Sequence, residues 1–510
     1  MKNLVLYSLM SLTFVWTSCG DFLEPQSQSE YEPELVQSLE ELLLGESYVG
    51  PGDGTLTPIL GLFDDDVEMR DDLTDYDASE EGKLEQIRYA FTWANKMSEH
   101  LGGYNIYGAV YNKIVGCNAV LDYLDDVQGT VEQKNDVKAQ ALALRGYFYF
   151  YLVNLYGKPY SVDKQALGVP LKLTSELVAG GIPRSSVEAV YSQVMTDLTE
   201  AERLLQTLPE NKQLRRNNRV SLPFVQLLLS RVCLYMENWE KALYYAGQVM
   251  QPAYGFSLLD LNTVPVPDPS SQITYPDYFT SDNPEVLFLF DELTGRTNFP
   301  LTRIIVNIGK GKSSKVVCAA SQKLIDSFAE TDLRKSRYLI WESVNPGEQP
   351  EYRLPVSKCE VGSWYHITTV AGTRWGMAFR LSEAYLNAAE AAAMLYKEKG
   401  QSDFAEQSRT LLDDLRKNRF APENFTAVEF ASAEELIRLV RAERRRELCF
   451  ENHRWFDLRR YGMPEIKHIW HNKSDHQEYI LKEKDPGYIL MIPHQAFSLN
   501  PSLVQNEERN

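Results

Sequence analysis

Residues 441–462 read RAERRRELCFENHRWFDLRRYG, and this charged and aromatic segment decides how the chain is organised. At helical spacing Glu443 and Glu447 lie one turn apart on the same face, with Arg444 beside them, so they can form ion pairs within the helix and across to a neighbour. Trp455 then supplies an apolar anchor. We therefore expect a role in the fold itself, and not in ligand binding, for five residues: Glu443, Arg446, Glu447, Trp455 and Arg459.

Outward from this segment, apolar residues at three- and four-residue spacing predict a mainly α-helical protein. Between residues 252 and 375 the pattern changes to clusters of Pro, Gly, Ser and Thr with short β-type runs, which predicts a loop-rich insertion with a few short strands. The expected helices cover about residues 105–126, 134–156, 186–207, 221–236, 239–251, 379–398, 403–418 and 433–449.

Two of the expected helix pairs resemble tetratricopeptide repeats. The first, around RVCLYMENWEKAL at 231–243, places Ala242 and Ala246 where a second helix must approach closely, and the second runs from Ala388 to Leu411. Small residues at such positions let neighbouring helix pairs stack. Because the spacing is irregular, we expect degenerate repeats that serve as a scaffold.

The segment at 441–462 resembles the C-terminal signature of the SusD/RagB family of outer-membrane lipoproteins. Other stretches agree with that family in the same order along the chain, so the resemblance covers nearly all of it. They are ALALRGYFYFYLVNLYG at 141–157, GVPL at 168–171, PRSSV at 183–187, NPEV at 283–286, RLSEAYL at 380–386, YILMIP at 488–493 and LNP at 499–501.

This resemblance implies a tetratricopeptide-like α fold and a non-catalytic cell-surface protein. Such a protein binds oligosaccharides and delivers them to a SusC-like TonB-dependent outer-membrane transporter. A peptide-capture subunit of the same type of transporter is the alternative, and a purely structural adaptor is a third interpretation. The expected divisions are a signal peptide at 1–18, a lipidated Cys and tether at 19–34, an N-terminal helical region at 35–251, the insertion at 252–375 and the C-terminal SusD/RagB region at 376–510.

The first twenty residues read as a targeting signal. A charged start is followed by a mostly apolar stretch at 4–16 and by small residues directly before Cys19. This pattern predicts a lipoprotein signal, with diacylglycerol and an acyl chain on Cys19 anchoring the protein in the outer membrane on its cell-surface side. Among the other cysteines, Cys318 with Cys359 is the one pair that we would test as a disulfide.

The composition opposes several classes of partner. With 52 Lys+Arg against 71 Asp+Glu, the chain has a net charge of -19. Contacts with phosphates need Lys or Arg and the surrounding field would repel a polyanion, so we expect no binding to nucleic acid. The same field makes sulfated or uronate-rich glycans poorer ligands than neutral ones.

The sequence offers no convincing catalytic or nucleotide motif. The closest string to a Gly-x-Ser-x-Gly hydrolase motif, at 45–50, has one residue too many, and the Gly-Lys-Ser at 311–313 lacks the upstream glycine of a phosphate-binding loop. We therefore expect no enzyme activity. Two further clusters are weighed as metal sites: Asp64, Asp66 and Glu68 could hold calcium without matching an EF-hand, and His468, His471 and His476 are expected to form a solvated loop.

A neutral glycan site typically combines an exposed aromatic platform with amide, carboxylate or Arg partners. Setting aside the tryptophans of the signal, the repeats and the signature, and Trp375 at the approach to a core helix, leaves Trp93, Trp341, Trp364 and Trp470 as candidate platforms. Trp93 is the first choice, because SusD-like proteins often place ligand contacts in that N-terminal region. The expected ligand-binding residues are Trp93, Asn95, Tyr104, Tyr275, Tyr278, Trp341, Trp364 and Tyr365.

Overall fold

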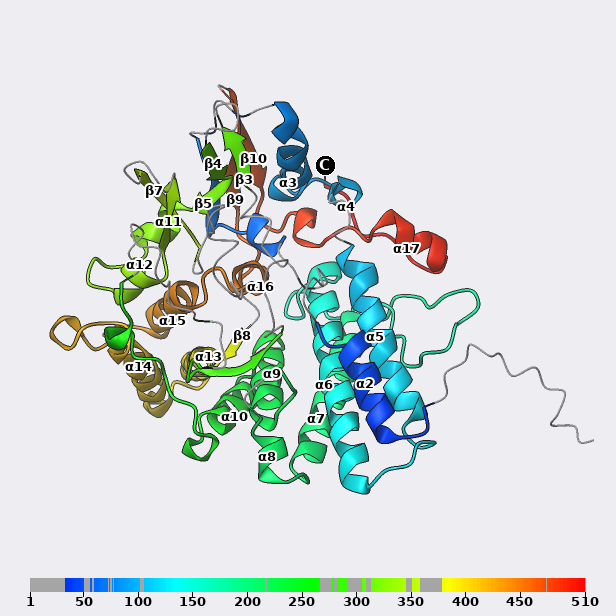
Figure 1. Cartoon of the computed structure of the whole chain (residues 1–510). Helices are drawn as coiled ribbons and strands as arrows, with labels where there is room; N and C mark the ends of the chain where they lie inside the picture. The colour runs from blue at the N-terminus through cyan, green and yellow to red at the C-terminus, as the bar shows by residue number, and fades with distance from the viewer. Residues whose placement is uncertain are drawn as a thin grey trace, which may run out of the picture.

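The structure is a computed structural model, and its mainly helical architecture is shown in Figure 1. Most of the short strands gather on one side of the molecule, above a curved row of longer helices, while β8 lies among the helices beside α9 and α13. Within the described part of the chain, no helix is both long and apolar enough to span a membrane. The described residues are 33–49, 56, 59–71, 73, 76, 78–100, 105–215, 218–266, 278, 282–290, 305–308, 313–344, 351–357, 378–473 and 475–509.

The N-terminal helices pack around α6 (Val131–Tyr156), which is buried along most of its length. Its start is fixed by a capping box, in which the Thr130 hydroxyl accepts from the Gln133 N–H and the Gln133 side chain accepts from the Thr130 N–H. Gly146 lets α7 come close, because a Cβ there would stand 3.1 Å from Leu198 Cγ. The helices around α6 are α2 (Val36–Glu46), α5 (Ile106–Tyr123) and α7 (Val187–Leu205).

The next helices form stacked antiparallel pairs, as the tetratricopeptide-like pattern predicts. Ala242 and Ala246 are fully buried, so the second helix of the first pair meets its neighbours at close range. Ser230 in the first helix donates to the Ala242 carbonyl at 3.0 Å, and Asn387 in the second pair donates to the Ser230 hydroxyl at 3.3 Å. After the short α8 (Glu210–Gln213), the pairs are α9 (Leu222–Tyr235) with α10 (Trp239–Val249) and α13 (Leu381–Lys399) with α14 (Ser402–Lys417), followed by α15 (Ala433–Glu447).

All eight helices predicted from apolar spacing are present, and their ends lie within three residues of the predicted ones. The loop-rich character of the insertion is also confirmed where it is described. It contains short strands and the small helices α11 (Gln322–Asp326) and α12 (Leu333–Arg337). The periodicity did not identify α2, α3 (Glu81–Phe91) or the short α4 (Met97–His100), α16 (Arg454–Arg460) and α17 (His494–Leu499).

The strands form five two-stranded antiparallel sheets in the described residues. Two sheets, β1 with β5 and β2 with β8, join the insertion to the scaffold, two more lie within the insertion, and the fifth is a hairpin near the C-terminus. The pairs are β1 (Val67–Met69) with β5 (Cys318–Ala320), β2 (Val286–Leu289) with β8 (Ala378–Arg380), β3 (Ile305–Ile308) with β4 (Ser313–Val316), β6 (Ile340–Val344) with β7 (Glu351–Ser357), and β9 (Ile466–Asn472) with β10 (Asp475–Leu481).

Glu447 of the signature is the centre of a buried ionic network. Its carboxylate lies 3.2 Å from the Arg334 guanidinium, 3.1 Å from that of Arg380 and 2.8 Å from that of Arg419. Tyr338 donates a further hydrogen bond to it at 3.1 Å. Because Arg334 and Tyr338 belong to the insertion and the others to the scaffold, this fully buried carboxylate joins the two parts of the fold.

The other signature residues also have structural surroundings. Glu443 is buried and lies 2.6 Å from both Arg334 and the half-buried Arg446. Trp455 is buried and stacks on Tyr488 at 4.8 Å between ring centroids. Arg459 donates to the Asn154 and Gly157 carbonyls, which occupy the C-terminal end of α6 where helix carbonyls lack partners.

A candidate ligand-binding cleft

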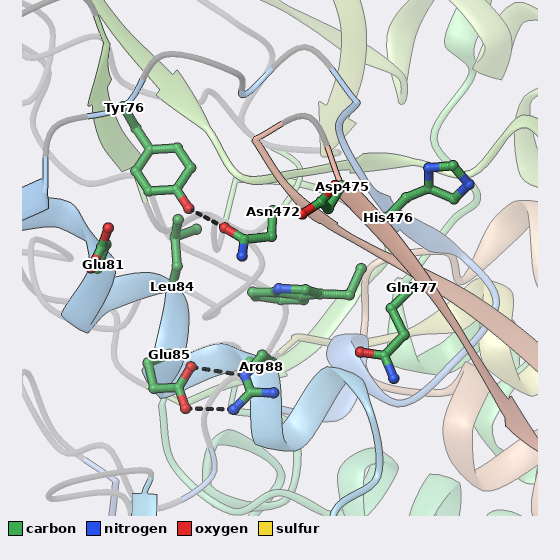
Figure 2. A pocket seen from close by; sticks show the side chains of 10 residues that line it. Tyr76, Glu81, Leu84, Glu85, Arg88, Asn472, Asp475, His476 and Gln477 are labelled. Atoms are coloured by element: carbon green, nitrogen blue, oxygen red, sulfur yellow. Dashed lines mark hydrogen bonds and ion pairs between the residues drawn. The ribbon is translucent and has the colours of Figure 1, made fainter.

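A cleft of about 680 Å³ opens between α3 and the β9–β10 hairpin. Its volume lies in the range of known small-molecule sites. Figure 2 shows the side chains of the helix on one side of the cleft and those of the hairpin on the other. The lining residues are Tyr76, Glu81, Leu84, Glu85, Arg88, Trp470, Asn472, Asp475, His476 and Gln477.

The register of the β9–β10 hairpin determines which of its side chains face the cleft. Trp470 stands opposite Gln477, and Asn472 stands opposite Asp475. Directly opposed residues project from the same face of a sheet, so these four side chains form two successive rows on one face. Lys473 in the turn has a φ of 55°, a left-handed conformation that tight hairpin turns require.

An aromatic stack supports the floor of the cleft. His468, on the same strand face as Trp470, lies between the rings of Phe91 and Trp93, with centroid distances of 4.2 Å to each. Its two ring nitrogens lie 2.7 Å from the Phe91 carbonyl and 2.9 Å from the Asp64 carbonyl. Burial lowers the pKa of His468, while these two carbonyls raise it. The stack fastens the C-terminal end of α3 to the hairpin and so fixes the two walls of the cleft.

Two tyrosines orient the amides of the cleft. Tyr76 donates to the Asn472 side-chain oxygen at 2.9 Å, and Tyr479 donates to the Gln477 side-chain oxygen at 2.8 Å. With the oxygen of each amide engaged, its NH₂ group is the part left to donate to a ligand. The cleft therefore presents two amide donors beside an indole, of which 8% of the surface remains exposed.

The charged groups of the cleft are largely paired with one another. Arg88 donates to both Glu85 oxygens, at 2.8 and 2.6 Å, and these hydrogen bonds hold the pKa of the Glu85 carboxyl below its usual value. The Lys473 ammonium lies 3.5 Å from Glu81 and 4.9 Å from the centre of the Tyr76 ring. Carboxylates that remain ionised are hydrogen-bond acceptors, so the cleft offers acceptors and donors side by side.

Trp93, the first choice for an exposed platform, is buried, and that expectation is wrong. Only 1% of its surface is exposed, and its indole N–H donates to the Phe63 carbonyl at 2.9 Å. Its φ of 52° is uncommon for a bulky residue, and the packing against His468 holds it there. Trp93 thus supports the cleft from below and does not face a ligand.

The remaining predicted ligand residues do not gather in this cleft. Asn95 forms hydrogen bonds with the backbone of Arg509, and Tyr278 is buried and donates to the Arg337 carbonyl at 3.1 Å. Trp341 lies on β6, and its side chain is outside the described part of the structure. Tyr104, Tyr275, Trp364, Tyr365 and the lipidation residue Cys19 lie outside the described residues, as does Cys359, whereas Cys318 is buried on β5 as a free thiol.

The acidic cluster at 64–68 does not form the calcium site considered from sequence. Asp66 is paired with Arg445 at 2.7 Å. The Asp64 side chain accepts the backbone N–H of Asp66, and the Glu68 side chain accepts the backbone N–H of Gln322. No group of three or more His, Cys, Asp or Glu side chains converges as metal ligands within the described residues. The guanidinium of Arg445 thus occupies the position beside Asp66 at which a calcium ion was considered.

The histidine segment expected to be a solvated loop is instead the β9–β10 hairpin. Burial alternates along β9, with Ile466, His468 and Trp470 inward and the residues between them exposed. This period of two was the sequence signal for a strand. The same alternation places Trp470 on the inward face of the strand. Nothing local in the sequence indicates that Tyr76 and α3 contact this hairpin.

Comparisons with known proteins agree with this architecture. A family model described as "SusD family" matches residues 342–508, and one described as "Starch-binding associating with outer membrane" matches residues 61–234. The chain is similar to SusD-like protein P25 of Formosa agariphila, with 20% identity over 441 residues, covering 79% of this chain and 78% of that protein.

Solved structures show the same fold. A SusD-like carbohydrate binding protein from Bacteroides vulgatus superposes with a TM-score of 0.64 at 21% identity, covering 92% of this chain and 97% of that one. A SusD superfamily protein from Bacteroides thetaiotaomicron superposes with a TM-score of 0.67 at 23% identity, covering 93% of this chain and 100% of that one.

Proposed function

The chain belongs to the SusD/RagB family, and from that premise we propose that it is a cell-surface lipoprotein that binds an oligosaccharide in the cleft between α3 and the β9–β10 hairpin. It delivers this ligand to a SusC-like TonB-dependent outer-membrane transporter. The lipid on Cys19 anchors it in the outer membrane, and no catalytic step is assigned to it.

The observation that carries this proposal is the combination of groups on one face of the hairpin. Trp470 lies in line with the donor groups of Asn472 and Gln477, and Asp475 stands beside them. A pyranose ring has an apolar face of C–H groups and a rim of hydroxyls that both donate and accept. An indole beside amide donors and carboxylate acceptors matches both features.

The electrostatics of the cleft support binding rather than hydrolysis. Glycoside hydrolysis requires a carboxylic acid with a raised pKa that can donate a proton to the leaving group. Glu85 has a lowered pKa because Arg88 hydrogen-bonds to both of its oxygens, so it stays ionised and cannot act as that acid at neutral pH.

A modest affinity is sufficient for this function. A dissociation constant of about 1 mM corresponds to about -4.1 kcal/mol, and one aromatic contact supplies on the order of 0.5–1.5 kcal/mol, so the cleft needs several contacts. Anchoring beside a transporter raises the local concentration of a captured ligand, which compensates for weak binding by the lipoprotein alone.

The test is calorimetric titration of residues 21–510 against neutral polysaccharides, acidic polysaccharides and a peptide digest. We expect saturable heat with a glycan, lost in Trp470→Ala and reduced in Asn472→Ala and Gln477→Ala. The last two residues are exposed, so their substitution leaves the core intact. Tyr244→Ala is the matched control, because that tyrosine is 59% exposed on α10, outside the cleft.

The outcomes separate the candidate functions. If the three cleft variants bind the glycan as strongly as the parent protein does, the glycan-binding site lies outside this cleft. Heat with peptides and none with glycans would favour the peptide-capture alternative. Reducing sugar released from a polysaccharide by the purified protein would contradict a purely binding role.

A further inference from the structure

The cleft carries an excess of negative charge. Three carboxylates line it, those of Glu81, Glu85 and Asp475, and two cations accompany them, Arg88 and Lys473. One carboxylate is therefore in excess. Asp475 has no ion-pair partner in the described part of the chain, and it is exposed beside the turn of the hairpin, opposite Asn472.

Both cations are already engaged by carboxylates of the cleft. Arg88 is held in a two-pronged pair by Glu85, and this pair lowers the pKa of the carboxyl and raises that of the guanidinium. Lys473 lies between Glu81 and the Tyr76 ring. An anionic ligand would have to displace one of these carboxylates and leave it without its partner, which costs more than the new contact returns.

We infer that this cleft discriminates by charge: it accepts uncharged saccharides and excludes those that carry carboxylate or sulfate groups. The inference rests on the proposed function and names the class of glycan that the same site takes. Asp475 and Glu81 are the residues that set the selectivity.

Uncharged saccharides can bind in such a cleft without electrostatic repulsion, because their hydroxyls form hydrogen bonds with its polar groups. Sugar hydroxyls donate to ionised carboxylates in strong charge-assisted hydrogen bonds and accept from the amide groups of Asn472 and Gln477. A uronate or sulfate brings only acceptors, and these meet the carboxylates as like charges. The net charge of -19 adds a long-range repulsion of the same sign.

The experiment compares two forms of one polysaccharide backbone. The neutral polysaccharide that binds in the calorimetric panel is titrated beside its own carboxymethylated derivative at about 20 mM and about 500 mM NaCl. At low salt we expect the anionic form to bind about three- to tenfold more weakly, as expected for close like charges at an exposed site. At high salt the difference shrinks, because the screening length becomes shorter than the cleft.

Substitutions assign the selectivity to named residues. Asp475→Asn removes the unpaired charge, and Glu81→Gln releases Lys473, so each variant is expected to raise the affinity for the carboxymethylated form several-fold relative to its own affinity for the neutral form. Glu478→Gln is the matched control. It removes the same charge from the same strand, but Glu478 pairs opposite Ile469 on the other face of the hairpin.

The results distinguish this inference from its premise. If both forms bind equally at low salt, and the binding depends on Trp470 and Asn472, the charge selectivity is refuted and the glycan site stands. An equal response of the control and the two cleft variants also refutes it. If no polysaccharide binds at all, the proposed function fails and the selectivity fails with it.

Discussion

The side-chain amide of Asn95 forms two hydrogen bonds with the backbone of Arg509. The Asn95 side chain donates to the Arg509 carbonyl at 3.0 Å and accepts from the Arg509 N–H at 2.9 Å. The Arg509 guanidinium also donates to the Thr92 and Trp93 carbonyls and, at 2.8 Å, to that of Ile480 in β10. This clamp joins the end of α3 to the hairpin, so it holds the two walls of the cleft at their separation.

Removing the clamp should loosen the cleft without dismantling the protein. We expect Asn95→Ala to lower the free energy of unfolding by about 1–2 kcal/mol, because two hydrogen bonds are lost. Hydrogen exchange should accelerate at residues 89–95 and in β10. Asn95→Asp keeps the acceptor for the Arg509 N–H and should have a smaller effect. Exchange rates in the alanine variant equal to those of the parent protein would show that the clamp does not hold the walls.

Trp93→Ala should act on stability, because the side chain is buried. Truncating a buried Trp typically costs about 3–5 kcal/mol of unfolding free energy, and denaturant unfolding followed by circular dichroism measures it. Trp93→Phe keeps an aromatic partner for His468 and loses only the indole N–H bond, so it should cost less. A Trp93→Ala protein that is as stable as the parent but has lost its ligand would restore Trp93 as a binding platform.

Glu447→Gln should be among the most destabilising single-atom exchanges in the chain. The change removes the charge that three buried arginines share, and breaking a buried ion pair costs about 3–5 kcal/mol. The midpoint of urea unfolding measures the loss. Glu434→Gln serves as control: its pair with Lys397 spans 3.7 Å at the surface and should contribute less than about 1 kcal/mol. Similar losses in the two variants would contradict the central role of Glu447.

His453 should make stability fall as the pH is lowered below about 6.5. Burial lowers its pKa far below the ordinary value, and the neighbouring arginines, Arg231 first, lower it further. The unfolded chain therefore binds a proton near pH 6.5 that the native state refuses, and each pH unit below this costs about 1.4 kcal/mol. Its Nδ1 lies 3.3 Å from the Arg444 guanidinium, which suits a neutral ring that accepts.

The measurement is the unfolding free energy of the parent protein and of His453→Gln at pH 7.5 and pH 5.5. The pH-dependent loss should be smaller in the variant by the contribution of one group. Taking the difference between the two proteins cancels the other titrating groups. One of these is Asp64, whose pKa is raised by burial and which acts in the opposite sense. Identical pH dependence in both proteins would show that His453 is protonated in the native state.

The scaffold was predictable from the sequence because its signals are local. Periodic apolar residues gave the eight long helices, and the spacing of Glu443 and Glu447 correctly indicated an ionic, structural segment. The packing of Ala242 and Ala246 follows from their size in the same way.

The cleft was not predictable to the same degree, because distant segments create it. Whether an aromatic such as Trp93 is exposed depends on His468 and Arg509, which lie far along the chain and leave no mark on the sequence around it. Trp470 is one of the four candidate tryptophans, but the cluster of histidines around it suggests a solvated loop, whereas the alternating burial along β9 is that of a strand.

The separation of the residues that build the cleft has a consequence for how the protein is made. Tyr76 meets Asn472 across 396 positions of the chain, and Asn95 meets Arg509 across 414. During synthesis, Tyr76 and Asn95 emerge long before residues 472–509, so the apolar side of α3 stays uncovered until that later segment is made. Long-range closure of this kind is slow and exposes aggregation-prone surface. The cleft therefore forms only after residues 472–509 have been synthesised.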